Sequence, residues 1–187
     1  MPRLVLTVIG DDRAGLVSAL ADVVATHDGN WEDSQLARLA GTFAGIVVVH
    51  APAERVEELT AALRALDGLL QVTLHAAPEL EAASAGTGAP DGSGDGPGGA
   101  SEAPQRLTID LLGNDHPGIV REVSAVLSSH DVSIESMTTG TREAPMAGGL
   151  LFEAHLVALL PGSVASSELS ADLERLAGEL LVDIAVA

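Results

Sequence analysis

Two short segments of the sequence carry residue types that can together hold a small charged molecule. The first reads Gly10-Asp11-Asp12-Arg13-Ala14-Gly15-Leu16-Val17, and the second reads Gly113-Asn114-Asp115-His116-Pro117-Gly118-Ile119-Val120. Each leads into an apolar stripe with helical spacing, and the free backbone amides of a helix start can bind a carboxylate. The Asp carboxylate can hold an ammonium group at the same place. A site with both properties suits a free α-amino acid.

The same residues also have a purely structural explanation. An Asp just before a helix is a favoured N-cap, Pro117 fits the first helical turn, and glycine lets another backbone or a ligand approach closely. A phosphate loop is excluded, because the G-x-x-x-x-G spacing lacks the following Lys and Ser or Thr. The residues alone leave a ligand site and an ordinary helix start as alternatives.

The two segments belong to two copies of one unit. An offset of 103 positions aligns identical residues, among them the eight pairs Leu4/Leu107, Gly10/Gly113, Asp12/Asp115, Gly15/Gly118, Val17/Val120, His27/His130, Asp28/Asp131 and Glu32/Glu135. Beyond these, Phe43 aligns with Phe152 at an offset of 109. The second copy therefore contains six extra residues, which we place within 141–149.

Hydrophobic periodicity predicts the same order of elements in each copy. Strict alternation predicts strands at 3–9 and 106–112. Apolar residues at i, i+4, i+7 and i+8 then predict a helix of about four turns that begins near Leu16 or Ile119. Further strands are expected at 30–39, 42–50, 132–140 and 150–159, a second helix in each copy, and last strands near 69–76 and 179–186. The order β-α-β-β-α-β predicts an α+β fold of two ferredoxin-like units, each an antiparallel four-stranded sheet with both helices on one face.

A change in composition separates the two copies. Residues 78–105 include seven Gly between Gly86 and Gly99 and contain five acids and no base. Such a segment buries too little apolar surface to fold alone, so we expect a flexible linker between domains at 1–77 and 106–187. A unit of about 80 residues has a marginal core, and the tether favours pairing of the two copies.

Composition excludes several classes of function. The chain has a net charge of −18, and its nine basic residues are all Arg, so direct binding to nucleic acid is not expected. It has no Cys, which excludes thiolate chemistry and disulfides, and its six His are scattered, so neither a metal site nor a cofactor is expected. No apolar run approaches the ~18 residues of a membrane span, and the N-terminus lacks a signal-peptide pattern. We therefore expect a cytoplasmic protein with no membrane contact.

The sequence pattern resembles the ACT domain, a βαββαβ ligand-binding regulatory module. The resemblance lies in the strand, the Gly-x-Asp-x-x-Gly-Leu/Ile-Val segment, the amphipathic helix, and a polar strand that opens with Asn30 or Ser133. Two such units joined by a linker are similar to the glycine cleavage system transcriptional repressor group. The second unit also carries the family's Pro, at Pro117, whereas the first unit has Ala14 there.

This resemblance implies two units packed side by side, commonly in a continuous eight-stranded sheet, with an amino acid or similar effector at the seam between them. Trp31 aligns with Ile134 and is expected in the core or the seam. The ligand-binding residues expected from the two loops and the starts of the second strands are Asp12, Arg13, Ala14, Gly15, Asn30, Asn114, Asp115, His116, Pro117, Gly118, Ser133 and Ile134.

The function expected from this resemblance is non-catalytic. A regulator of this kind binds an effector and signals through a protein partner such as a transcriptional activator, and a homodimer of two chains is compatible with the family. Residues 106–187 carry a net charge of −8, so we expect a basic partner to dock near Glu168, Asp172 and Glu174. The alternative is a regulatory accessory subunit of an amino-acid biosynthetic enzyme such as acetolactate synthase. An enzyme is not expected, since two units and a linker leave no residues for a catalytic domain.

Overall fold

The computed structural model describes residues 2–76, 105–144 and 149–187 of the protein. The predicted linker lies outside these ranges except for Gln105, which begins a strand. The elements of the first unit are β1 (Arg3–Asp11), α1 (Leu16–Thr26), β2 (Asn30–Leu39), β3 (Thr42–His50), a short 3-10 turn η1 (Ala53–Arg55), α2 (Val56–Arg64) and β4 (Gln71–Ala76). Those of the second are β5 (Gln105–Asn114), α3 (Ile119–Ser129), β6 (Ser133–Glu143), β7 (Leu150–Leu160), α4 (Ser166–Leu180) and β8 (Val182–Val186).

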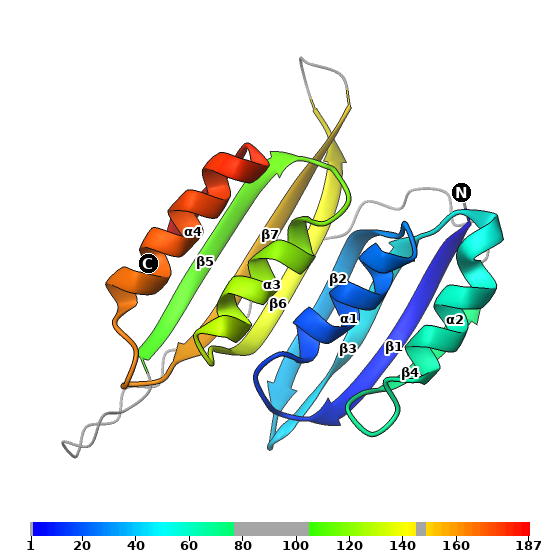
Figure 1. Ribbon diagram of the computed structural model, residues 1–187, viewed down its shortest axis with the longest axis horizontal. Coiled ribbons are helices and arrows are strands. Elements are labelled where there is room, and N and C mark those ends of the chain that lie inside the picture. The colour runs from blue at the N-terminus through cyan, green and yellow to red at the C-terminus, as the bar shows by residue number, and fades with distance from the viewer. Residues whose placement is uncertain (1, 77–104, 145–148) are drawn as a thin grey trace.

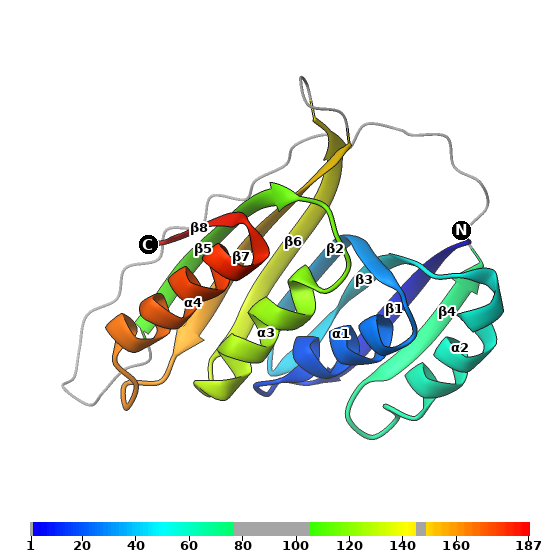
Figure 2. The same ribbon diagram turned by 45° about the horizontal axis from the view of Figure 1, so that its top comes forward.

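The strands form one eight-stranded antiparallel sheet in the order β4-β1-β3-β2-β6-β7-β5-β8 (Figure 1; β8 is labelled in Figure 2). This arrangement confirms the two βαββαβ units and their side-by-side pairing. The register confirms the repeat, because Gly10 faces Phe43 in the first unit and Gly113 faces Phe152 in the second. The β2 and β3 boundaries are those predicted from the alternation.

All four helices cover one face of the sheet (Figure 2). Alternate strand residues point at them and are fully or almost fully buried, as Leu6 and Val47 are in the first unit and Ile109 and Leu156 are in the second. Each helix contributes one apolar stripe to the same core. Among the described residues, no helix combines the length and the apolar character needed to cross a membrane.

Several element bounds differ from the sequence predictions, and two of the differences involve helices. Helices α1 and α3 each have 11 residues, which is about three turns and not four. The last strand begins at Val182 and not near 179, because α4 continues to Leu180. Leu181 follows with a left-handed φ of 55°, and this turn separates the helix from the strand.

The two units join where β2 pairs with β6 in antiparallel register. Ser34 lies opposite Thr139, and Leu36 lies opposite Met137. All four residues are buried. The repeat equates Ser34 with Met137 and Leu36 with Thr139, so the seam contains one polar pair and one apolar pair where exact symmetry would give two identical pairs.

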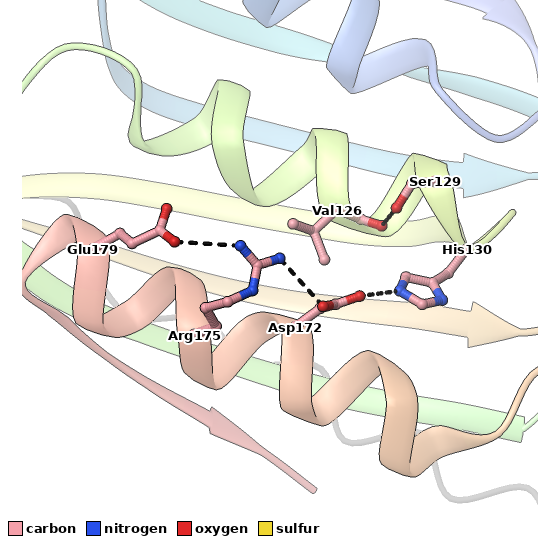
Figure 3. Close-up of polar contacts among 6 residues, drawn as sticks. All are labelled: Val126, Ser129, His130, Asp172, Arg175 and Glu179. Carbon is pink, nitrogen blue, oxygen red and sulfur yellow. Dashed lines mark hydrogen bonds and ion pairs between the residues drawn. The ribbon is translucent and has the colours of Figure 1, made fainter.

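Charged side chains connect α3 with α4 on the outer side of the helical layer (Figure 3). His130 Nε2 lies 2.9 Å from Asp172 Oδ2, and Arg175 donates to Asp172 and to Glu179 at 3.2 Å each. The His130 contact, followed by the Arg175 contact, lowers the pKa of Asp172 below its ordinary value. Asp172 is therefore already paired, whereas Glu168 and Glu174 are exposed.

Candidate functional site

The two predicted loops have the same backbone form, which depends on glycine. Gly15 and Gly118 are the N-cap residues of α1 and α3, with left-handed φ values of 87° and 101°. No side chain caps either helix start, so the expectation that Asp12 or Asp115 serves as the N-cap is wrong. Pro117 precedes the N-cap and so lies outside the first helical turn. The glycines are needed because L side chains disfavour this conformation.

Backbone and side-chain hydrogen bonds fix each loop against its own unit. The Asp12 amide donates to Gly41 O at 3.0 Å, and the Asp115 amide donates to Leu150 O at 2.8 Å. The residue after each Asp contacts the chain at or beyond the end of its unit's second helix. Arg13 donates at 3.2 Å to Gly68 O, in the turn between α2 and β4. His116 Nε2 lies 3.3 Å from Leu180 O. The loops are thus held in place by equivalent contacts with different side chains.

Two pockets lie at the seam on the helical side of the sheet, and the repeat relates one to the other. One joins the start of β2 to the second loop and α3, with a lining that includes Asn30, Trp31, His116, Gly118, Arg121 and Phe152. The other joins the first loop and α1 to α3 and β6, with a lining that includes Arg13, Gly15, Phe43, Ser128 and Ile134. Each has a cavity volume of about 10 Å³, which is about the room that one water molecule needs.

The predicted site residues divide between these pockets and their surroundings. Arg13, Gly15 and Ile134 line the first-loop pocket, and Asn30, His116 and Gly118 line the second-loop pocket. Pro117 lines an open depression of about 460 Å³ between α3 and α4. The remaining predicted residues, which line neither seam pocket, are Asp12, Ala14, Asn114, Asp115 and Ser133.

Asp115 nevertheless takes part in the seam through a hydrogen bond between the units. Asn30 Nδ2 donates to Asp115 Oδ2 at 3.0 Å, so the start of β2 contacts the second loop directly. The other carboxylate oxygen, Asp115 Oδ1, is buried and has no hydrogen-bond partner among the described residues. A buried carboxylate oxygen without a partner is costly, so this atom favours a donor or a cation beside it.

Asp12 has a different environment, which the sequence did not reveal. Arg38, at the end of β2, donates to Asp12 Oδ2 at 3.1 Å and to Glu135 Oε1 of the other unit, also at 3.1 Å. Arg106 binds the same Glu135 at 2.8 and 2.9 Å. Hydrogen bonds from Arg106 first, and from Arg38, lower the pKa of Glu135, and the bond to Asp12 raises the pKa of Arg38.

The first unit contains a counterpart of the Arg106–Glu135 pair. Arg3 Nε lies 2.9 Å from Glu32 Oε2, and His50 Nδ1 lies 2.7 Å from Glu32 Oε1. An offset of 103 aligns Arg3 with Arg106 just as it aligns the two Glu residues. The recurrence of the same Arg and Glu in both copies is a feature of the sequence from which both ion pairs could have been predicted. Arg38 occurs in one copy only and gave no such signal.

The fold and the seam together define a class of protein: two ferredoxin-like units in one sheet, with small pockets where the loop of one unit meets a strand or helix of the other. The chain matches the ACT domain family model over residues 2–77 and 105–187. It therefore belongs to the ACT domain family, as a tandem of two ACT units, and the family indicates regulation through small-molecule binding.

Three comparisons place the chain among known proteins. UPF0237 protein MK1213 from Methanopyrus kandleri is 43% identical over 49 residues, which are 26% of this chain and 54% of that protein. The chain thus spans about half the length of this curated relative. The crystal structure of an unknown protein from Galdieria sulphuraria is 27% identical, with a TM-score of 0.44, and covers 99% of this chain and 96% of its own. The crystal structure of a provisionally assigned glycine cleavage system transcriptional repressor is 14% identical, with a TM-score of 0.41. The match covers 100% of this chain and 96% of that chain.

Aspartate kinase from Synechocystis has the same fold over part of its length. Its structure is 14% identical with a TM-score of 0.54, and the match covers 94% of this chain and 26% of the kinase. This similarity supports the fold alone.

Proposed function

We propose that the protein is a non-catalytic regulator that binds an amino acid or a related small effector at the seam between its two ACT units. The observation that carries this proposal is the Asn30–Asp115 hydrogen bond between the units, beside which Asp115 Oδ1 is buried without a described partner. An effector ammonium group would supply the missing donor. It would touch both units at once, as an effector that changes their relative position must do.

The start of α3 supplies the complementary half of the site. The first amides of a helix have no partner within it and carry partial positive charge, so they suit the effector carboxylate. Residues 118–121 line the pocket at this helix start. Arg121 adds a guanidinium group, whose Nε is 2.7 Å from Asp22 Oδ1 of α1. The effector carboxylate would compete with Asp22 for this group.

The small size of the pocket favours a small effector. A cavity of about 10 Å³ holds no more than one water, so any amino acid must open the seam as it binds. Glycine requires the smallest opening and is the first effector to test. Opening would shift the population of orientations between the units, and about 1.4 kcal/mol of coupling changes partner affinity tenfold.

We further propose that the output is a protein contact. A net charge of −18 disfavours direct binding to nucleic acid, so a basic surface of a protein partner is the complementary target. The resemblance of the tandem to the glycine cleavage system transcriptional repressor group supports control of glycine cleavage gene expression through a transcriptional activator.

Calorimetry with each of the twenty amino acids tests the sensing proposal. Wild type should bind at least one of them, and Asp115→Ala should bind it at least tenfold more weakly. Asp110→Ala is the matched control, because it removes an Asp from the same unit on an exposed strand position, where it contacts His155. No binding by wild type, or equal binding by Asp115→Ala and wild type, would contradict the proposal.

Two further measurements test the non-catalytic part. Purified protein should turn over no substrate in a phosphatase and hydrolase screen. Co-purification from native extract should yield a regulatory partner, and recovery of a large biosynthetic enzyme chain would instead favour an accessory subunit.

A further inference from the structure

Arg38 and Thr141 are one pair of equivalent residues at which the two seam sites differ. Arg38 lies opposite Phe43 in the β2–β3 register, and Thr141 lies opposite Phe152 in the β6–β7 register. The repeat equates the two Phe residues, so Thr141 occupies in the second unit the backbone position that Arg38 occupies in the first. At this position the first unit therefore has a long cationic side chain and the second unit has a short neutral one.

In the first site, the side chain of Arg38 already pairs with the acidic groups. Its guanidinium joins Asp12 of the first loop to Glu135 of the second unit, with both distances at 3.1 Å. The three side chains are only partly exposed, at 27% for Arg38, 15% for Asp12 and 21% for Glu135. A charge-assisted contact of this kind is stronger than one between neutral groups.

The second site has the same acidic groups without the cation. Asp115, the equivalent of Asp12, receives only the neutral amide of Asn30, and its Oδ1 has no partner among the residues that the structure describes. Glu32, the equivalent of Glu135, is satisfied by Arg3 and His50 of its own unit. Thr141 brings no positive charge to this end of the seam.

We propose that the two seam sites are inequivalent, because Arg38 is a resident cation that occupies at Asp12 the place that an effector ammonium group takes at Asp115. The chain then binds one effector, at the Asp115 site. This inference rests on the proposed function and specifies which site performs it.

The physical reason is competition between a tethered cation and a free one. Arg38 is held beside Asp12 by its own strand, so its effective concentration there is high and a free ammonium group displaces it poorly. Among the described residues no cationic side chain is held beside Asp115 in this way, and an arriving cation relieves a buried oxygen that has no described partner. The same two loops therefore differ in affinity although their backbones are alike.

Exchanging the two residues tests the inference in both directions. Thr141→Arg should place a guanidinium beside Asp115 and weaken amino-acid binding at least tenfold in calorimetry. Thr138→Arg is the matched control, since it adds the same charge to an exposed position of the same strand and should leave affinity within twofold of wild type.

Arg38→Thr should release Asp12 and raise the stoichiometry from one to two amino acids per chain. Arg38→Lys retains a cation at this position and should still bind one amino acid per chain. Arg64→Thr, which removes an exposed Arg from α2, should also bind one. Arg38→Met keeps the aliphatic stem without the charge, so it provides a second route to an opened site if Arg38→Thr folds poorly.

The outcomes separate this inference from the function on which it rests. Binding of two amino acids by wild type, or unchanged binding by a folded Thr141→Arg, would overturn the inequivalence and leave the sensing function standing. If Arg38→Thr and Arg38→Met both fold and each still binds only one amino acid per chain, the inequivalence would also be overturned. Absence of binding to wild type and to every variant would overturn the sensing function itself.

Discussion

Trp31 Nε1 lies 3.3 Å from Thr139 Oγ1, and this hydrogen bond joins the two units inside the seam. Both residues are buried. Ser34 Oγ lies 3.0 Å from the same Thr139 hydroxyl. One hydroxyl of the second unit therefore satisfies two buried groups of the first, which makes this short polar cluster sensitive to changes at the seam.

Replacement of Thr139 by Val should destabilise the protein by about 2 to 3 kcal/mol, because two buried polar groups would lose their partner. Thr139→Ser keeps the hydroxyl and should cost less than half as much. Urea denaturation of the two variants and wild type measures the difference. Equal stability of Thr139→Val and Thr139→Ser would show that the cluster contributes packing and not hydrogen bonding.

Trp31 should also report effector binding. It is the single Trp of the chain, and it lines the second-loop pocket beside Asn30. An effector that opens this pocket should change the emission maximum or intensity of Trp31 in proportion to site occupancy, as measured by fluorescence titration. A calorimetric binding curve with no matching fluorescence change would place the effector away from this pocket.

The sequence predicted the order of elements and most boundaries because each depends on local alternation or helical spacing. The side-by-side pairing of the two units followed from the marginal size of each unit and from the family resemblance, whereas the structure identifies β2 and β6 as the paired strands. Helices α1 and α3 begin at the predicted residues, Leu16 and Ile119. Only their N-caps were predicted incorrectly, as Asp12 and Asp115, because an Asp near a helix start matches the N-cap preference whichever residue has the cap conformation. Gly15 and Gly118 take that position with positive φ.

The charged part of the seam was harder to predict from the sequence. Arg38 is far in sequence from both Asp12 and Glu135, and a strand residue gives no sign of which long-range partner it will meet. The strand register decided this contact. Ala37 pairs with Ser136, so the next residues along the two strands are Arg38 and Glu135. The two copies reveal their difference in charge here only when Arg38 is aligned with Thr141, and the strand register establishes that alignment.

Replacement of Gly118 by Ala should cost about 1 to 2 kcal/mol through backbone conformation alone. Its φ of 101° is unfavourable for an L side chain, while an added Cβ would meet no atom within 4 Å. Gly178 is the matched control, since it lies within α4 and also has open space around it. Gly178→Ala should stabilise the protein by about 0.5 to 1 kcal/mol because it restores helix propensity. Thermal or urea unfolding should give opposite signs for the two variants.

Protonation of Glu135 should weaken the seam at acidic pH. Hydrogen bonds from Arg106 and Arg38 hold the pKa of Glu135 below its ordinary value of 4.5. A carboxyl group whose pKa is lowered by folding contributes stability that is fully present above its unfolded pKa and is lost as the pH falls through its lower folded value.

Glu135→Gln should therefore destabilise the protein by about 1 kcal/mol at pH 7. This difference from wild type should shrink as the pH falls below about 4.5. Urea denaturation from pH 3 to pH 7 measures both effects, and Glu174→Gln, at an exposed position of α4, serves as the control. A difference between Glu135→Gln and wild type that stays constant with pH would mean that the side chain acts by packing and not by its charge.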